Sequence, residues 1–315
     1  MIYFRFHAYM LGYVKSVVVK KDHILSLSQE NKEEFNMALD FFADTSNWLQ
    51  NLFHVEKPII AMCHLLPLPG DPYYDEEKGL EAIIERAKAD VKALQDGGVD
   101  GIMFSNEYSL PYLTKMEPIT LAAMAYVIGR VKEEVSIPYG INCLWDPISS
   151  LDVAKATGGK FIREIISGVY ASDFGIWNTN AGETARHRHR IGADDVKMLY
   201  NIVPEAAVYL ADRDIAQIAK TTEFNCKPDA ICVSGLTAGS ETDTQVLTQV
   251  KKATKKTPIF CNTGCNKDNI VRQLSASDGA VCATTFKVDG KFENPVDYNR
   301  VKEFMDVVKE FRKTL

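Results

Sequence analysis

Four side chains that could transfer protons follow apolar, strand-like segments of this chain: His64, Glu107, Asp146 and Asp173. Glutamate, aspartate and histidine are the usual general acids and bases of enzymes. The run PIIAMC is followed by His64 and then by a loop with three prolines. Prolines restrict the backbone, so this loop would hold the imidazole in a fixed position above the end of the strand. The pattern therefore indicates an acid–base site in which Glu107 or Asp146 is the base and His64 is the acid.

Two of these residues can also be interpreted structurally. Asp146 precedes Pro147, so its carboxylate would equally cap the helix that follows. His64 would equally donate a hydrogen bond to a nearby carbonyl group and fix the proline loop. Glu107 lies several residues before any predicted helix, so capping does not account for it.

A second set of small and polar residues follows the same kind of segment and would bind a substrate. Glycine, serine and threonine leave backbone N–H groups free to face an anion, although they are also common in ordinary turns. Phosphate often binds after the seventh and eighth strands of a barrel, which predicts a small phosphorylated metabolite as ligand. The predicted substrate-binding residues are Asn106, Asn142, Arg163, Asn201, Ser234, Gly235, Asn262, Thr263, Gly264, Thr284 and Thr285.

A repeated pattern of strand and helix must position these residues. Eight short segments rich in Val, Ile and Phe begin near residues 58, 101, 139, 161, 196, 230, 258 and 279, and a helical pattern follows each of them. This alternation predicts parallel strands joined by crossovers, and eight units over about 230 residues predict a single (β/α)₈ TIM barrel. An open doubly wound sheet is the alternative, but no G-x-G-x-x-G motif follows the first strand.

Residues 1–54 stand outside this pattern, and we expect the barrel to occupy residues 55–315. The segment EEFNMALDFFADTSNWLQNLF (residues 33–53) has the pattern of an amphipathic helix that would close the bottom of the barrel. The expected fold is therefore a TIM barrel with an N-terminal helical extension. Met37 is an alternative start, so residues 1–36 are expected either to precede the true start or to be disordered.

The composition excludes several classes of protein. A net charge of −6 argues against a nucleic-acid-binding protein, which needs a basic surface. No run approaches 18 apolar residues, so no transmembrane segment is predicted, and the opening residues lack the features of a signal peptide. Seven cysteines without a C-x-x-C pair indicate a reducing, cytoplasmic compartment. A homo-oligomer is left open.

No cofactor is predicted, and a divalent metal ion at the carboxylates is left open. Cys63, Cys143, Cys261 and Cys265 lie near strand ends and could hold a soft metal together with His64. Packing accounts for these cysteines equally well, because free cysteine is among the most buried residue types.

Two charged motifs have mainly structural interpretations. Arg163 and Glu164 are neighbours in one strand and must point to opposite sides of it. One of them faces the barrel interior and needs a partner there, and the other must be reached by a helix. The run ARHRHR (residues 185–190) is typical of a solvated helix face rather than of a phosphate-binding site.

Seven motifs of the chain together resemble the BtpA family, also called the BtpA/SgcQ family. They occur in order from about residue 58 to residue 301: MCHLLPLPG, GGVDGIMFSNE, YGINCLWD, TGGKFIR, SDFGIW, RHRHRIGADDVKML and NPVDYNRV. The resemblance implies a barrel of the phosphate-binding TIM-barrel superfamily. The positions of this chain that match family-typical positions are His64, Pro67, Pro69, Gly70, Asp100, Gly101, Glu107, Asn142, Arg163, Asp173, Gly175 and Lys197.

The resemblance implies two hypotheses about function. The founding member of the family is associated with photosystem I accumulation, which implies a non-catalytic assembly or stability factor for a membrane protein complex. FIREI, GVYASD and NIVPEA resemble the SgcQ branch, which occurs beside sugar-metabolism genes and implies an enzyme acting on a sugar phosphate or related phosphorylated metabolite. Isomerase, epimerase and aldol-type lyase are the expected classes. After the fifth strand the chain departs from the commoner pattern of Asp, His and Lys, with Asn201, Val203 and Glu205.

Overall fold

The computed structural model describes residues 3–10, 13–20, 48–235 and 239–315, which fall into two compact units, residues 1–45 and 46–315. In the first unit, strands β1 (Tyr3–Met10) and β2 (Tyr13–Lys20) form an antiparallel hairpin. No pattern in the sequence predicted this hairpin. The rest of residues 1–36, like residues 33–47 of the predicted helix, lies outside the described residues.

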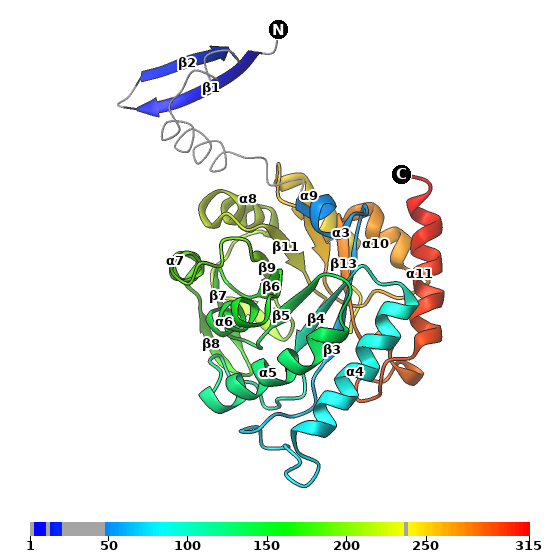
Figure 1. Ribbon diagram of the computed structural model, residues 1–315. Helices are drawn as coiled ribbons and strands as arrows, with labels where there is room; N and C mark the ends of the chain where they lie inside the picture. Colours follow the sequence, from blue (N-terminus) through cyan, green and yellow to red (C-terminus); the bar gives the residue numbers. More distant parts are fainter. Residues whose placement is uncertain (1–2, 11–12, 21–47, 236–238) are drawn as a thin grey trace. The chain divides into compact units, whose positions relative to one another are not determined.

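The second unit contains a closed parallel barrel of eight strands (Figure 1). Neighbouring strands pair in the order β3-β4-β5-β6-β9-β11-β12-β13, and β13 pairs with β3 to close the ring. The predicted TIM barrel is confirmed. The strands are β3 (Ile59–His64), β4 (Gly101–Ser105), β5 (Tyr139–Asn142), β6 (Phe161–Glu164), β9 (Lys197–Val203), β11 (Ala230–Val233), β12 (Ile259–Cys261) and β13 (Gly279–Cys282).

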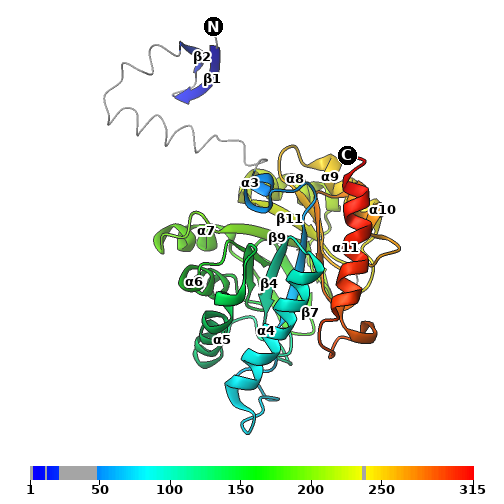
Figure 2. The same ribbon diagram turned by 45° about the vertical axis from the view of Figure 1, so that its right-hand side comes forward.

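Helices surround the barrel, and the last helix packs beside the first helix of the ring (Figure 2). Their apolar faces cover the outward side chains of the strands in one large cluster of buried residues. The helices are α4 (Gly79–Gly97), α5 (Pro118–Val131), α6 (Pro147–Thr157), α7 (Ala181–Arg190), α8 (Ile215–Cys226), α9 (Thr244–Ala253), α10 (Ile270–Ala276) and α11 (Tyr298–Arg312), with short 3₁₀ turns η2 (Lys132–Glu134), η3 (Thr284–Phe286) and η4 (Val288–Gly290).

The starts of most of these helices are fixed by local side-chain caps. An Asp or Asn side chain accepts a hydrogen bond from a backbone N–H of the first turn, which has no partner within the helix. The capping residues are Asp146 for α6, Asn180 for α7, Asp214 for α8, Asp243 for α9 and Asp297 for α11. These short-range signals explain why helix positions could be read from the sequence.

Helix α3 (Trp48–Phe53), the described part of the predicted amphipathic helix, closes the bottom of the barrel. Trp48 and Phe53 belong to the same buried cluster as the inward side chains of the strands, and Trp48 donates its indole N–H to the carbonyl of Asp229 at 2.9 Å. The ring of Phe53 contacts Phe161 with 5.8 Å between centroids. Gly101 leaves room for it, because a Cβ there would lie 2.7 Å from the Phe53 ring.

A small antiparallel sheet lies in the loops that follow β6 and β9. It consists of β10 (Ala207–Tyr209), β7 (Val169–Ser172) and β8 (Gly175–Asn178), in that order. Tyr170 and Trp177 on one face are buried, and Trp177 packs against Trp145 with 5.2 Å between ring centroids. The sequence predicted only a long loop here, because the three strands are short and β10 pairs with β7 from a distant part of the chain.

Phe53→Ala should destabilise the protein by about 3–5 kcal/mol, because it leaves a cavity where α3 meets the barrel interior. Urea unfolding followed by circular dichroism would measure this loss. Phe224→Ala is the matched control, since the Phe224 side chain is 73% exposed and its removal should change the free energy of unfolding by about 0.5 kcal/mol or less. Equal effects of the two substitutions would contradict the closing role of α3.

Candidate active site

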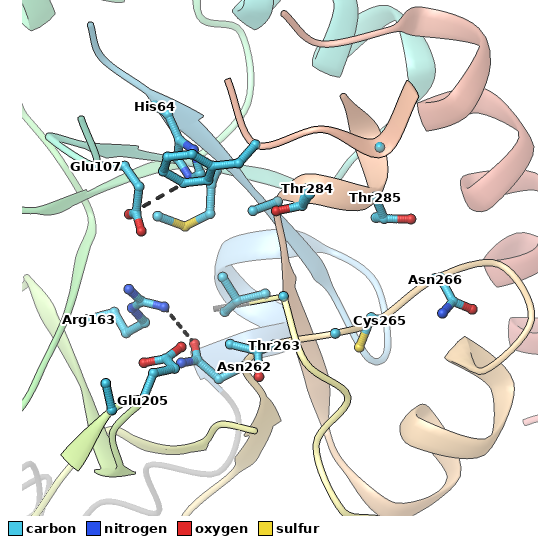
Figure 3. Close-up of a pocket in the computed structure, with 18 of the residues that line it drawn as sticks. His64, Glu107, Arg163, Glu205, Asn262, Thr263, Cys265, Asn266, Thr284 and Thr285 are labelled. Atoms are coloured by element: carbon cyan, nitrogen blue, oxygen red, sulfur yellow. Dashed lines mark hydrogen bonds and ion pairs between the residues drawn. The ribbon is translucent and has the colours of Figure 1, made fainter. Parts of the chain in front are cut away.

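A pocket of about 390 Å³ opens at the carboxyl ends of the barrel strands (Figure 3). Each of the eight barrel strands, or the loop that follows it, contributes at least one lining residue. The structure thus brings residues from the whole length of the barrel sequence around one hollow. The predicted site residues that line it are His64, Glu107, Arg163, Asn262, Thr263, Gly264, Thr284 and Thr285.

Glu107 and His64 form the acid–base part of this pocket. Their side chains approach to 3.8 Å between Oε2 and Nε2, and Ser105 donates a hydroxyl hydrogen bond to Glu107 Oε2 at 3.1 Å. Burial raises the pKa of Glu107, while the charge of Arg163 opposes that rise. Burial, aided by the positive charge of Lys287, holds the pKa of His64 well below its usual range, so the imidazole is neutral. A carboxylate with a raised pKa beside a neutral imidazole is suited to proton transfer near neutral pH.

Arg163 lies in the interior beside this pair and is held by amide oxygens. Its Nη1 donates to Asn262 Oδ1 at 2.9 Å and its Nη2 to Asn142 Oδ1 at 2.6 Å. Within the described part of the chain its Nε has no hydrogen-bond partner, although the residue is only 5% exposed. The guanidinium therefore keeps its full charge beside the pocket, which Arg163 lines.

Several residues predicted to bind substrate instead support Arg163 and the strands around it. Asn142, Asn201 and Ser234 are buried and do not line the pocket. Ser234 Oγ accepts N–H groups from Asn262 at 2.7 Å and from Asn201 at 3.0 Å. The expectation that Asn142 and Asn201 orient substrate hydroxyl groups is not supported, because the amide groups are already used inside the barrel wall.

Glu164 extends this network outward, as the parity of the strand predicted. Its Oε1 accepts hydrogen bonds from Asn142 Nδ2 at 2.6 Å and from Ser150 Oγ of α6 at 2.8 Å. Burial raises its pKa to about 8. The side chain is fully buried, so at neutral pH the protonated form is favoured and no unpaired charge lies behind Arg163.

Two carboxylates predicted as catalytic lie outside the residues that line the pocket. Asp146 caps α6: its oxygens accept from the N–H groups of Ile148, Ser149 and Met116 and from the Ser149 hydroxyl. Asp173 is exposed in the turn between β7 and β8, where the hairpin directs its neighbour Phe174 into the pocket instead. The helix-cap interpretation of Asp146 thus accounts for its position.

Two further predicted residues also have structural positions outside the pocket. Asn106 is buried and accepts the N–H of Leu144 at 2.7 Å, which holds the loop after β5. Gly235 donates its N–H to Thr263 Oγ1 at 2.6 Å, and a Cβ at this glycine would lie 2.5 Å from the carbonyl oxygen of Ser240. Both residues shape the loops around the pocket without lining it.

The side of the pocket opposite Glu107 has the features of an anion site. Thr284 and Thr285 open the turn η3 after β13, and the first N–H groups of such a turn have no partner within it. Gly264 follows β12 in the left-handed conformation (φ +68°). Arg300 also lines the pocket and donates from Nε to the carbonyl of Thr285 at 2.9 Å, which places a positive charge there. Figure 3 shows Thr284 and Thr285 across the hollow from Arg163.

Sequence reasoning missed several lining residues. Glu205 was noted at the end of the fifth strand but not predicted as a site residue, although it follows β9 much as Glu107 follows β4. Aromatic residues from four different loops had no comparable signal, since neither their spacing nor their neighbours set them apart. The missed residues include Glu205, Arg300, Tyr112, Trp145, Phe174 and Phe292.

Neither a metal-binding cluster nor a membrane-spanning helix is found among the residues that the structure describes. Within residues 48–235 and 239–315 and the hairpin, no three His, Cys, Asp or Glu side chains are grouped so as to hold a metal ion. All seven cysteines lie in the described part and are free thiols, with Cys261 and Cys265 Sγ atoms 3.3 Å apart. None of the described helices combines the length and the apolar character needed to span a bilayer.

The closed barrel with a polar pocket at its carboxyl-terminal mouth defines a protein of the TIM-barrel class. More specifically, the chain belongs to the BtpA family, whose sequence profile matches residues 55–310. The resemblance inferred from the seven motifs is therefore confirmed.

Two curated relatives illustrate the range of the family. The chain is 57% identical to "Putative sgc region protein SgcQ" of Escherichia coli (strain K12) over 267 residues, which are 85% of this chain and 100% of that protein. It is 33% identical to "Photosystem I biogenesis protein BtpA" of Synechocystis sp. over 261 residues, 82% of this chain and 90% of that one. The expected similarity to the SgcQ branch agrees with these values.

Solved structures with similar folds share little sequence with this chain. (S)-3-O-geranylgeranylglyceryl phosphate synthase from Thermoplasma acidophilum, solved in complex with sn-glycerol-1-phosphate, has a TM-score of 0.55 at 14% identity and covers 84% of this chain and 98% of its own. The corresponding enzyme from Thermoplasma volcanium has a TM-score of 0.53 at 12% identity, over 85% and 97% of the two chains. At this identity the similarity shows the TIM-barrel fold and no more.

Glu164→Gln should change the pH dependence of stability. The pKa of Glu164 rises from 4.5 to about 8 on folding, so its contribution is complete below about pH 4.5 and is lost as the pH rises toward 8. The free energy of unfolding of the unsubstituted protein should fall by a few kcal/mol between pH 5 and 8, and the glutamine variant should fall less. Urea titrations at several pH values measure both curves, with exposed Glu76→Gln as control; parallel curves for Glu164→Gln and the parent would refute the assignment.

Proposed function

We propose that this protein is an enzyme that acts on a sugar phosphate or a related phosphorylated metabolite, as an isomerase, epimerase or aldol-type lyase. The observation that carries the proposal is one pocket with two ends. Glu107, His64 and Arg163 lie at one end, and the loops with Gly264, Thr284 and Thr285 lie at the other (Figure 3). A convergent polar pocket of this size is typical of a small-molecule site.

The inner end of the pocket would carry out the proton transfer. Glu107 is the proposed base, since its raised pKa strengthens it as a proton acceptor near neutral pH. His64 is neutral and can donate an N–H to a substrate oxygen that gains negative charge during the reaction. Arg163 lines the same pocket, and its positive charge acts on both groups.

The outer end of the pocket would hold the phosphate group. Barrel enzymes frequently bind phosphate at the loops after the seventh and eighth strands, which are β12 and β13 here. Arg300 supplies the positive charge, and the loops supply backbone N–H groups. The barrel enzyme from T. acidophilum, whose fold is similar, was solved with sn-glycerol-1-phosphate, a ligand of the proposed class.

A non-catalytic assembly factor is the second candidate function. It is favoured by the name of the Synechocystis relative, a photosystem I biogenesis protein. The small sheet also presents an outward apolar face, on which Val208 and Ile176 are 71% and 65% exposed. Buried titratable groups gathered in one pocket favour the enzyme, because binding of a partner protein does not need them.

The working environment follows from the same observations. We infer a cytoplasmic location, because free thiols persist under reducing conditions. A net charge of −6 makes nucleic acid an unsuitable partner.

A thermal-shift screen of hexose, pentose and triose phosphates should find compounds that raise the melting temperature, since a ligand that binds only the folded state stabilises it. The shift should disappear or shrink strongly in Arg300→Met, which removes the charge at the phosphate end, and change less in Glu107→Gln. Exposed Glu76→Gln should behave as the unsubstituted protein. A folded protein that responds to none of these phosphates would shift the balance to the assembly-factor function.

A further inference from the structure

Glu205 is a buried pocket carboxylate that the proposed function does not yet use. It follows β9 and lines the pocket, and Ser234 donates a hydrogen bond to it. Its Oε2 is buried without a hydrogen-bond partner among the side chains and backbone groups that the structure describes. An ionised carboxylate oxygen left unpaired in this way is costly, so burial raises the pKa of Glu205 and favours its protonated form.

Glu205 and Glu107 lie on either side of Arg163 (Figure 3). Burial raises the pKa of Glu205, the charge of Arg163 lowers it and the charge of Glu107 raises it further, so both charges act on this carboxyl group. The Nη groups of Arg163 donate hydrogen bonds to the amide oxygens of Asn262 and Asn142 rather than to either glutamate.

The balance of charge among Glu107, Glu205 and Arg163 sets the protonation of the two glutamates. With both glutamates ionised, one guanidinium would face two carboxylates. Burial raises the pKa of each glutamate, and the charge of Glu107 adds to the rise at Glu205. Two interacting carboxyl groups of this kind titrate as a pair, so that one is ionised while the other still holds its proton.

We propose that Glu205 is the second catalytic group of this site, and that Glu205 and Glu107 together move a proton between adjacent carbon atoms of a phosphorylated α-hydroxy aldehyde or ketone. The proposal rests on the proposed function and selects one of its reaction classes, isomerisation next to a carbonyl group. It also changes the role of His64, which then orients a substrate oxygen while Glu205 or Glu107 supplies the proton.

The chemistry balances with these two side chains alone. The ionised carboxylate takes the proton of the carbon that carries the hydroxyl group, and the C–H electron pair forms a C=C bond. The carbonyl oxygen simultaneously takes the proton of the neutral carboxyl group, which gives an enediol. The two carboxyl groups have now exchanged protonation states. In the second half of the reaction, the glutamate that took the carbon-bound proton returns it to the neighbouring carbon. The other hydroxyl group gives its proton to the ionised glutamate. This gives the isomer and restores both glutamates.

Two measurements test this inference. The first needs no substrate: ¹³C NMR titration of labelled glutamate carboxyl groups should show that Glu107→Gln lowers the pKa of Glu205, since a nearby negative charge is lost. Glu205→Gln should lower that of Glu107 in the same way, and Glu76→Gln should change neither. Independent titration of the two glutamates would overturn the pairing.

The second measurement follows hydrogen exchange and turnover in D₂O with the hexose and pentose phosphates of the thermal-shift screen. The unsubstituted protein should introduce deuterium next to the carbonyl carbon, and Glu205→Gln should lower kcat by about 10²–10⁴-fold with a smaller change in KM. Full activity of Glu205→Gln would overturn the catalytic role of Glu205 and leave His64 as the acid. If the unsubstituted protein turned over none of the phosphates, this would count against the proposed function and its reaction. The NMR titration tests the coupling of the two glutamates independently of turnover.

Discussion

The site depends on one buried positive charge, the guanidinium of Arg163. Burying a charge in a protein interior is costly unless hydrogen bonds compensate for the lost water. Here two amide oxygens, from Asn142 and Asn262, supply those bonds. Because an amide oxygen is neutral, it compensates for water without cancelling the charge. The positive charge therefore remains effective on the titratable groups around the pocket, Glu107, His64 and Glu205.

The closed barrel is what makes this arrangement geometrically feasible. Arg163 lies on β6, Asn142 on the neighbouring β5, and Asn262 directly after β12, three strands further round the ring. One hydrogen bond thus follows the barrel wall and the other crosses its interior. Below this level the interior is filled by apolar side chains, including Phe53, Phe161 and Phe260. The barrel interior is therefore filled by apolar side chains at the bottom and lined by polar and charged groups at the mouth.

Much of the fold and part of the site could be predicted because they follow from local rules. Alternating strands and helices predicted the barrel, and strand parity predicted that Arg163 and Glu164 would separate to the inside and the outside. The cap interpretation of Asp146 was also local. The roles of Asn142 and Asn201 could not be predicted, since whether an amide meets a substrate or another side chain depends on what lies opposite it.

The sequence alone determined the periodicity, the helix caps and the kinds of chemistry available at each strand end, because these depend on residues a few positions apart. Only the tertiary structure decided which of those side chains share one pocket. Glu205 and Phe174 come from separate loops, which the small sheet of β7, β8 and β10 joins across distant segments, and Arg300 comes from α11. Ring closure sets these distances, and no local stretch of sequence encodes them.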